Sequence, residues 1–141
     1  MTEAIIHRKA AVAAWTRLVR VYQSVDHASE KNFRSLGLNT ACFDVLARVR
    51  GREGMTQNEL AEALLVTKGN ISQLVTKLVG TGWLERRAEG RTQRLFLTVS
   101  GRAMADRALP EQEELLARSL QALSPSELQE LIRLLRKWEK S

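Results

Sequence analysis

The chain has 141 residues, of which 22 are Lys or Arg and 16 are Asp or Glu, so its formal charge at pH 7 is +6. This length suits one domain, and the basic excess suits a polyanionic partner. A single cysteine, Cys42, excludes an internal disulfide and a cysteine-rich zinc site. No apolar run is long enough to cross a membrane, and His7, Arg8 and Lys9 interrupt any signal-peptide core. We therefore expect a cytoplasmic protein that binds neither membrane, metal nor cofactor.

The N-terminal part of the chain predicts one long helix. Apolar residues recur at helical spacing over residues 3–35, and neither Gly nor Pro interrupts them before Gly37. A small domain cannot cover so long a helix, so we expect part of it to pack on a partner. A second helix follows, capped by Asn39 or Thr40 and ending at Gly51.

The segment from Thr56 to Thr98 carries the most informative pattern. Thr56-Gln57-Asn58-Glu59 is a capping box that begins a short helix, and Leu65-Val66-Thr67 forms a turn. Thr67 caps a second helix that runs to about Val79. The apolar residues expected on the buried face of the first helix are Leu60, Ala61, Leu64 and Leu65.

Two short strands, residues 83–87 and 94–98, are expected next, joined by residues 88–93. A long helix then runs from Thr98 or Ser100 to about Leu123, and Pro110 should kink or divide it. A second capping box, residues 124–127, begins the last helix. The order predicts a mainly α fold with a small β-hairpin wing. Residues 38–99 would form a winged helix-turn-helix core, and residues 1–37 and 100–141 would flank it within one domain, 1–141.

The helix that Thr67 begins has one apolar face and one short, polar face. Its polar face centres on Gly69, Gln73 and Thr76, opposite the stripe that contains Ile71 and Val75. Amide and hydroxyl side chains can pair with base edges in the DNA major groove. The alternative is an ordinary amphipathic helix with a solvated face. The residues predicted to contact DNA from this helix are Thr67, Lys68, Gly69, Asn70, Ser72, Gln73, Thr76 and Lys77.

The arginines of the hairpin provide a second set of candidate DNA contacts. Arg91 lies at the predicted tip, where a guanidinium could enter a narrow minor groove, and Glu89 could hold it by an ion pair. Arg86 and Arg94, with Arg87, flank the strands and could contact phosphates. The alternative is that these arginines only keep the hairpin soluble.

These motifs resemble the MarR family of bacterial transcription regulators. The resemblance lies in residues 38–46, 55–61 and 67–72, and in the hairpin pattern Glu89, Arg91, Leu95, Leu97 and Thr98. Glu89 stands where the family more usually has Asp. The resemblance implies a DNA-binding regulator, usually a repressor, whose two-fold homodimer binds a pseudo-palindromic operator. It also implies that a ligand or an oxidant weakens DNA binding.

Dimerisation would use the amphipathic helices at both ends of the chain. The expected interface residues are Ile5, Val12, Leu128, Leu131, Ile132, Leu135 and Trp138. The resemblance also implies that an effector binds between these helices and the DNA-reading region, and we expect it to be a small aromatic or phenolic molecule. Its candidate contacts are Trp15, Tyr22, Phe43 and Met104, with Arg17, His27 and Asp44 as polar groups. The alternative is that these aromatic residues fill the core or the dimer interface.

Other functions remain as alternatives. The module could be an architectural DNA binder or a protein-binding winged helix, or Cys42 could act as a redox switch. His7 and His27 are too far apart in sequence for a clear metal pair. An enzyme is not expected, because no paired carboxylates, activated nucleophile or glycine-rich phosphate loop can be found.

Overall fold

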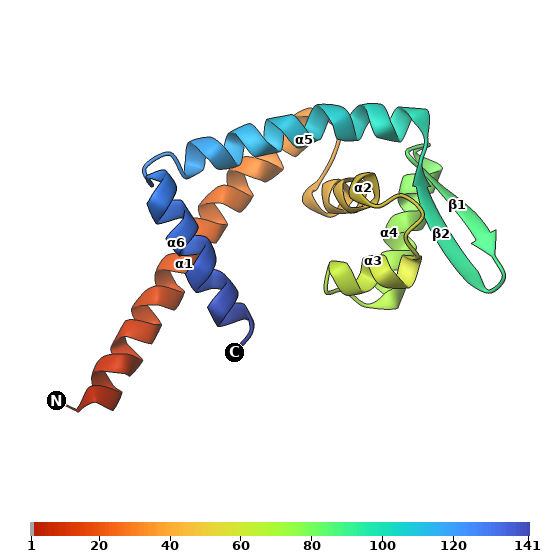
Figure 1. The fold of residues 1–141 in the computed structure, drawn as a ribbon. Helices are drawn as coiled ribbons and strands as arrows, with labels where there is room; N and C mark the ends of the chain where they lie inside the picture. Colours follow the sequence, from red (N-terminus) through yellow and green to blue (C-terminus); the bar gives the residue numbers. More distant parts are fainter. Residues whose placement is uncertain (1) are drawn as a thin grey trace. The chain divides into compact units, whose positions relative to one another are not determined.

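The computed structural model describes residues 2–141 and confirms the mainly α fold with a small hairpin (Figure 1). The elements in chain order are α1 (Glu3–Ser35), α2 (Thr40–Gly51), α3 (Gln57–Ala63), α4 (Lys68–Gly80), β1 (Leu84–Glu89), β2 (Thr92–Leu97), α5 (Val99–Ser119) and α6 (Pro125–Glu139). They form two compact units, and α1 and α5 contribute to both. Residues 26–111 make up the reader unit; the described residues up to Val25, with residues 112–141, make up the terminal unit. None of the described helices is long and apolar enough to span a membrane.

Side-chain caps fix where four of the helices begin. Asn39 Oδ1 accepts a hydrogen bond from the Cys42 amide at 2.8 Å, so Asn39 rather than Thr40 caps α2. Thr56 and Ser124 form the predicted capping boxes with Glu59 and Glu127. The Thr67 hydroxyl accepts from the Asn70 amide at 3.2 Å and begins α4. Each cap satisfies a backbone amide that the helix leaves free.

The core of the reader unit lies where α2, α3, α4 and the hairpin meet (Figure 1). Phe33 stacks on Phe43 with ring centroids 4.4 Å apart. The hairpin is antiparallel, and its register pairs Leu84 with Leu97 and Arg86 with Leu95. The largest fully buried side chains are Phe33, Leu46, Leu60, Ile71, Leu78, Leu84, Leu95, Val45, Val49 and Val75. This core holds α4 and the hairpin in a fixed relation.

The start of α5 lies unusually close to the backbone that precedes β1. A Cβ atom at Gly101 would lie 1.9 Å from the Trp83 carbonyl oxygen, so only glycine fits there. Thr98 occupies the same junction. Its hydroxyl donates to the Gly82 carbonyl at 2.5 Å and accepts from the Gly101 amide at 3.0 Å. The far end of the hairpin is thereby anchored to α5.

The terminal unit has no buried side chain of its own among the described residues. Trp15 of α1 and Trp138 of α6 meet edge to face, with centroids 6.4 Å apart. Leu128, Leu131 and Ile132 of α6 are only half-buried. The apolar faces of both helices thus remain open to solvent in a single chain.

Three expectations about local structure were wrong. The strands are longer than predicted, so the tip is the two-residue turn Gly90-Arg91, with Gly90 at a φ of 62°. Leu65 is 93% exposed at a φ of 55°, because it belongs to the turn rather than to the buried face of α3. Pro110 was expected to kink or divide the long helix; it does not divide α5, which continues through it and ends at Ser119 rather than at about Leu123.

Candidate nucleic-acid interface

The polar face of α4 is open to solvent, opposite a buried apolar stripe. Ile71, Val75 and Leu78 are buried in the core, and Leu74 is half-buried. The residues of this helix and its cap that are exposed are Thr67, Lys68, Gly69, Asn70, Gln73, Thr76 and Lys77, whereas Ser72 is half-buried. The structure therefore places seven of the eight predicted contacts of α4 on its surface.

Arg86 of β1 lies between α3 and α4 rather than free in solvent. Its Nη2 donates to the Ser72 carbonyl at 3.0 Å and to Thr76 Oγ1 at 2.8 Å. Its Nε donates to Gln57 Oε1 at 3.3 Å. One guanidinium thus joins the hairpin to both helices of the helix-turn-helix. The prediction that Arg86 contacts phosphate overlooked this structural role.

These bonds reduce the number of polar groups of α4 that are free to bind another molecule. The Thr76 hydroxyl donates to the Ser72 carbonyl at 2.8 Å while it accepts from Arg86. Its single proton is therefore already used, and the Thr67 hydroxyl is engaged as the helix cap. The side-chain amides of Asn70 and Gln73, by contrast, have no hydrogen-bond partner among the described residues.

Arg94, also predicted as a phosphate contact, has internal partners as well. Its Nε pairs with the Glu89 carboxylate, and its Nη1 donates to the Gly54 carbonyl at 2.8 Å. The expected pair between Glu89 and Arg91 is absent for a geometric reason. Glu89 and Arg94 are diagonal neighbours on one face of the hairpin, whereas Arg91 lies in the turn.

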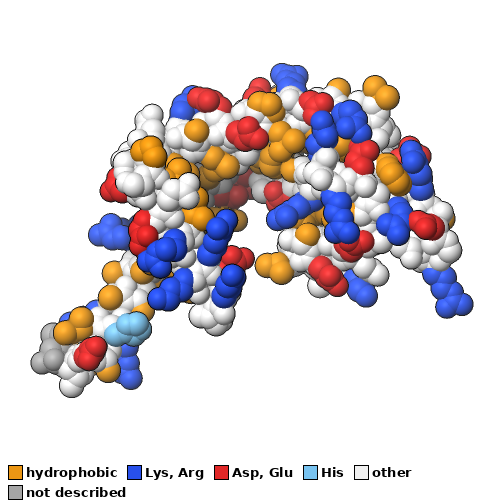
Figure 2. Space-filling view, in the orientation of Figure 1, with side chains coloured by type: hydrophobic (Ala, Val, Ile, Leu, Met, Phe, Trp, Pro, Cys, Tyr) orange, Lys and Arg blue, Asp and Glu red, His pale blue; other side chains and the backbone are white. Residues whose placement is uncertain are grey.

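Of the hairpin arginines, Arg91 alone has no internal partner among the described residues. Arg87 lies over the Phe96 ring at 3.9 Å and pairs with Glu85 at 2.9 Å. Arg91 is exposed at the tip, and it forms neither an ion pair nor a hydrogen bond with the described residues. Figure 2 shows Lys and Arg side chains over the hairpin with Asp and Glu side chains among them. Arg91 is the hairpin cation that is free to meet another molecule.

A polar notch lies between the beginning of α3 and the hairpin tip. It has a volume of about 410 Å³, and its walls are Thr56, Gln57, Asn58, Arg91, Thr92 and Gln93. In the sequence, Gln57 and Asn58 stand out only as part of the capping box and of the 55–61 motif, and neither is predicted to contact DNA. The run Thr92-Gln93 was assigned to a loop, so nothing in the sequence brought these residues together.

The predicted effector residues are divided between the two units. Trp15 and Tyr22 belong to the terminal unit, where both are exposed, and Phe43 is buried in the core of the reader unit against Phe33. Met104 is half-buried beside that core. Phe43 therefore has the packing role that was the alternative.

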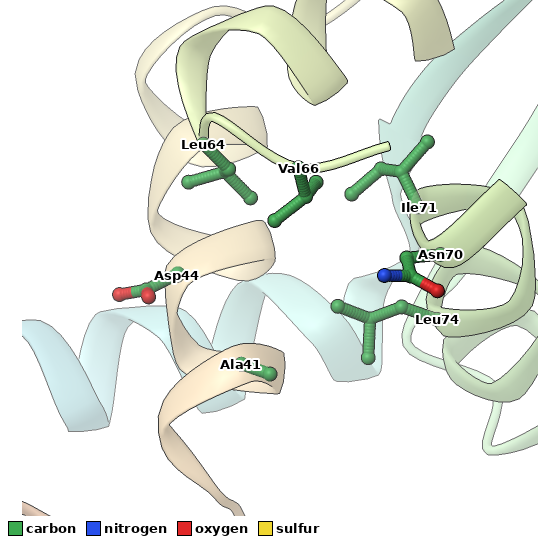
Figure 3. A pocket seen from close by; sticks show the side chains of 7 residues that line it. All are labelled: Ala41, Asp44, Leu64, Val66, Asn70, Ile71 and Leu74. Atoms are coloured by element: carbon green, nitrogen blue, oxygen red, sulfur yellow. The ribbon is translucent and has the colours of Figure 1, made fainter. Parts of the chain in front are cut away.

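A separate apolar pocket lies beside α4, within the reader unit (Figure 3). Its volume is about 220 Å³, and its walls are Ala41, Asp44, Leu64, Val66, Asn70, Ile71 and Leu74. Burial raises the pKa of the Asp44 carboxyl above its ordinary value, nearby Arg48 opposes this, and Asp26 adds to it. The pocket combines an apolar lining with one carboxyl and one amide.

Cys42 is buried, and its environment does not favour the thiolate. Burial raises its pKa above the ordinary value, and this outweighs the opposing effects of Lys77 and of the hydrogen bond at Asn39. A redox switch needs an accessible, acidic thiol. The structure therefore gives no support to oxidation at Cys42. Among residues 2–141, no cluster of His, Cys, Asp or Glu could hold a metal ion.

Comparison with known proteins identifies the architecture. Residues 36–95 match the sequence model of the MarR family. An uncharacterized HTH-type transcriptional regulator from Bacillus cereus is 40% identical over 98 residues, covering 70% of this chain and 67% of that relative. The chain belongs to the MarR family. It is a DNA-binding transcriptional regulator, and MarR-family proteins of this kind are not enzymes.

A further relative and two solved structures agree with this assignment. The uncharacterized HTH-type transcriptional regulator YkoM of Bacillus subtilis is 30% identical over 121 residues, covering 84% of this chain and 79% of YkoM. A mutant of MarR from E. coli, solved with operator DNA, has a TM-score of 0.80 at 26% identity, covering 90% and 94% of the two chains. AbsC from Streptomyces coelicolor shares the fold, with a TM-score of 0.86 at 22% identity, covering 99% and 95%. In this winged helix-turn-helix, α4 occupies the position of the recognition helix, because it is the second helix of the helix-turn-helix, and the β1–β2 hairpin occupies the position of the wing.

Proposed function

We propose that this MarR-family protein is a sequence-specific repressor that binds a pseudo-palindromic operator as a homodimer. Residues 38–99 would form the DNA-binding region, and residues 1–37 and 100–141 would form the dimerisation part. The proposal rests on the observation that some polar side chains of this region have internal partners and others have none. Arg86 and Arg94 hold the reader together, while Asn70, Gln73 and Arg91 have no partner within the described residues.

Base reading is assigned to the two free amides of the recognition helix. Asn and Gln side chains can form two hydrogen bonds with adenine in the major groove. Lys68 and Lys77 border the same exposed face and would contact phosphates. Arg91 would enter the adjacent minor groove from the wing tip.

The homodimer is proposed from the apolar surface of the terminal unit. Ile5, Val12, Trp15, Leu135 and Trp138 are exposed, and no described side chain of this unit is buried. In a monomer these apolar side chains stay in water, and each Å² of apolar surface left exposed forgoes about 25 cal/mol of stabilisation. A second copy would cover them, and a two-fold pair would present two recognition helices to successive major grooves.

Control by a small apolar effector is the second part of the proposal. The pocket of Figure 3 supports it, because its walls include Asn70 and Ile71 of the recognition helix. A molecule bound there would touch the element that reads DNA. Its binding would therefore change operator affinity through linkage.

The decisive experiment replaces Gln73 by Ala and compares binding to the DNA upstream of the protein's own gene with binding to a random duplex. Loss of a base contact should weaken operator binding about tenfold or more and leave random binding nearly unchanged. The control is Gln121→Ala, which removes an exposed amide from the terminal unit and should leave both affinities unchanged. Equal losses on both duplexes would support an architectural DNA binder instead.

A further inference from the structure

The polar notch between α3 and the wing is built from groups that can donate hydrogen bonds. We propose that it is a binding site for one phosphodiester of the DNA backbone in each half-site. This assignment rests on the proposed function, and it adds Gln57, Asn58, Thr92 and Gln93 to the DNA interface. The ligand is therefore a phosphate anion, and we assign it to DNA rather than to free phosphate.

The hydrogen-bond donors that line the notch are available to a ligand. Gln57 Oε1 already accepts from Arg86 Nε, which leaves the Gln57 NH₂ group as a donor. Asn58 and Gln93 are exposed, and their side-chain amides have no partner within the described residues. The Thr92 hydroxyl and the Arg91 guanidinium complete the set.

The charge of the notch suits an anion. Arg91 lines it, and no Asp or Glu does. The nearest acidic side chains along the chain are held elsewhere: Glu59 pairs with Arg52 at 2.7 Å and caps α3, and Glu89 pairs with Arg94. A phosphate oxygen would consequently meet donors without a competing carboxylate, which is the arrangement that backbone recognition uses.

The two walls of the notch are held in register by backbone hydrogen bonds. The Leu95 amide donates to the Met55 carbonyl at 2.9 Å, and the Gly54 amide donates to the Leu95 carbonyl at 2.8 Å. Thr56 also forms an antiparallel bridge with Arg94. The segment before α3 thus pairs with β2, so the notch is present before DNA arrives.

Its position agrees with the path that the backbone would take. One wall comes from α3, the first helix of the helix-turn-helix, which in this class crosses the backbone beside the major groove. The other wall comes from the wing tip, which is proposed to enter the minor groove. The sugar-phosphate backbone of the DNA strand that separates the major groove from the minor groove would pass between these two walls of the notch.

The test combines substitutions in the notch with neutral linkages in the DNA. Operator duplexes that carry a single methylphosphonate, placed at successive positions of one half-site, are titrated with the wild type and with an Asn58→Ala/Gln93→Ala variant. Both residues are exposed, so the variant should retain the melting temperature of the wild type. Gln121→Ala is the control for an exposed amide outside the notch.

At one linkage the methylphosphonate should weaken wild-type binding about tenfold but weaken the variant no more than about twofold. Equal losses for both proteins at every linkage would overturn the notch assignment. If the wild type does not prefer the unmodified operator to random DNA, the proposed function itself fails. Specific wild-type binding without any coupled linkage would leave that function intact and remove only the notch.

A melting series in inorganic phosphate, without DNA, separates the two possible sources of the anion. If phosphate changes the melting temperature of the wild type and of the variant equally, the assignment of the notch to a DNA phosphodiester is supported. Stabilisation of the wild type by millimolar phosphate that the variant lacks would make free phosphate the ligand and would overturn it.

Discussion

Arg86 of the wing and Thr76 of the recognition helix are joined by a hydrogen bond of 2.8 Å, although they belong to different elements. The same guanidinium nitrogen also donates to the Ser72 carbonyl. Because Thr76 uses its proton on that carbonyl, the three groups form a closed arrangement. One side chain therefore couples the wing to the exposed face of α4. Arg86 positions these two elements relative to each other and is not expected to contact bases.

Replacing Arg86 by Met should destabilise the fold by about 1–2 kcal/mol and weaken operator binding, because Gln57 and Thr76 each lose a donor. Thermal or urea unfolding gives the stability, and a double-mutant cycle with Thr76→Val gives the coupling. A coupling of at least about 0.5 kcal/mol is expected for bonded partners. Arg87→Met, which removes a surface contact with Phe96, is the matched control. Additive effects of the Arg86 and Thr76 substitutions would contradict the link.

Replacing Arg91 by Ala should weaken DNA binding without changing stability, because Arg91 is exposed and has no internal partner among the described residues. If the Arg91 guanidinium displaces one counterion from DNA, the plot of log binding constant against log salt concentration should become less steep by about 0.9 in the variant. A preference for A·T pairs beside the half-sites should also weaken. The measurement is a salt series on operators with different flanks. An unchanged slope together with unchanged flank preference would exclude Arg91 from the interface.

Replacing Leu135 by Glu should yield monomers and lower operator affinity by about a hundredfold or more, since one reader cannot span two half-sites. Sedimentation velocity gives the oligomeric state, and a DNA titration gives the affinity. The control is Val99→Glu, which introduces the same charge at another apolar residue, 90% exposed, in the reader unit. A Leu135→Glu protein that remained dimeric would show that α6 lies outside the interface.

Replacing Leu65 by Gly should stabilise the protein by about 1 kcal/mol. Leu65 has a φ of 55°, which strains an L-residue with a side chain, and its exposure of 93% means that little apolar burial is lost. The greater freedom of glycine in the unfolded chain offsets part of this gain. Leu64→Gly is the contrasting variant, because Leu64 packs against the core and its loss should be destabilising. A lower melting temperature for Leu65→Gly would refute the argument from strain.

Replacing Asp44 by Asn should raise the melting temperature near neutral pH by roughly a degree or two. Burial raises the Asp44 pKa in the fold above its ordinary value of 3.8. The stability linked to its protonation is therefore present below that value and is lost as the pH rises through the folded pKa. The advantage of the Asp44→Asn variant over the wild type is thus largest at neutral pH and disappears in acid. Melting curves of both proteins from about pH 7 to about pH 3 test this, and a difference that grew in acid would reverse the sign.

Much of the fold could be predicted because the signals were local. The caps at Asn39, Thr56, Thr67 and Ser124 depend on residues three positions apart, and the structure confirms each of them. Errors arose where local preference was overridden. Leu65 looked apolar and therefore buried, yet the turn geometry exposes it. Pro110 predicted a kink or a division of the helix, and the division is not found, since α5 continues through it.

The candidate site was harder to predict, because its partners are distant in sequence. The sequence distinguished Arg91 at the hairpin tip from Arg86 and Arg94 on the strands, but it predicted DNA contacts for all three. In the structure, Arg86 donates a hydrogen bond to Gln57, 29 positions away in the sequence, and Arg94 donates one to Gly54, 40 positions away. Arg91 is unpaired among the described residues. Phe43 presents the same difficulty, since its place in the core depends on Phe33 of another helix.

The sequence by itself determined the order of the elements, the positions of the caps and the apolar and polar faces of α4, because each depends on side chains within one or two helical turns. Tertiary structure alone decided which polar groups are free. A hydrogen bond such as that of Arg86 with Thr76 forms only after the hairpin folds against α4 and brings a donor to its acceptor. The same packing creates the notch between α3 and the wing, whose two walls are distant along the chain and meet only in the folded protein.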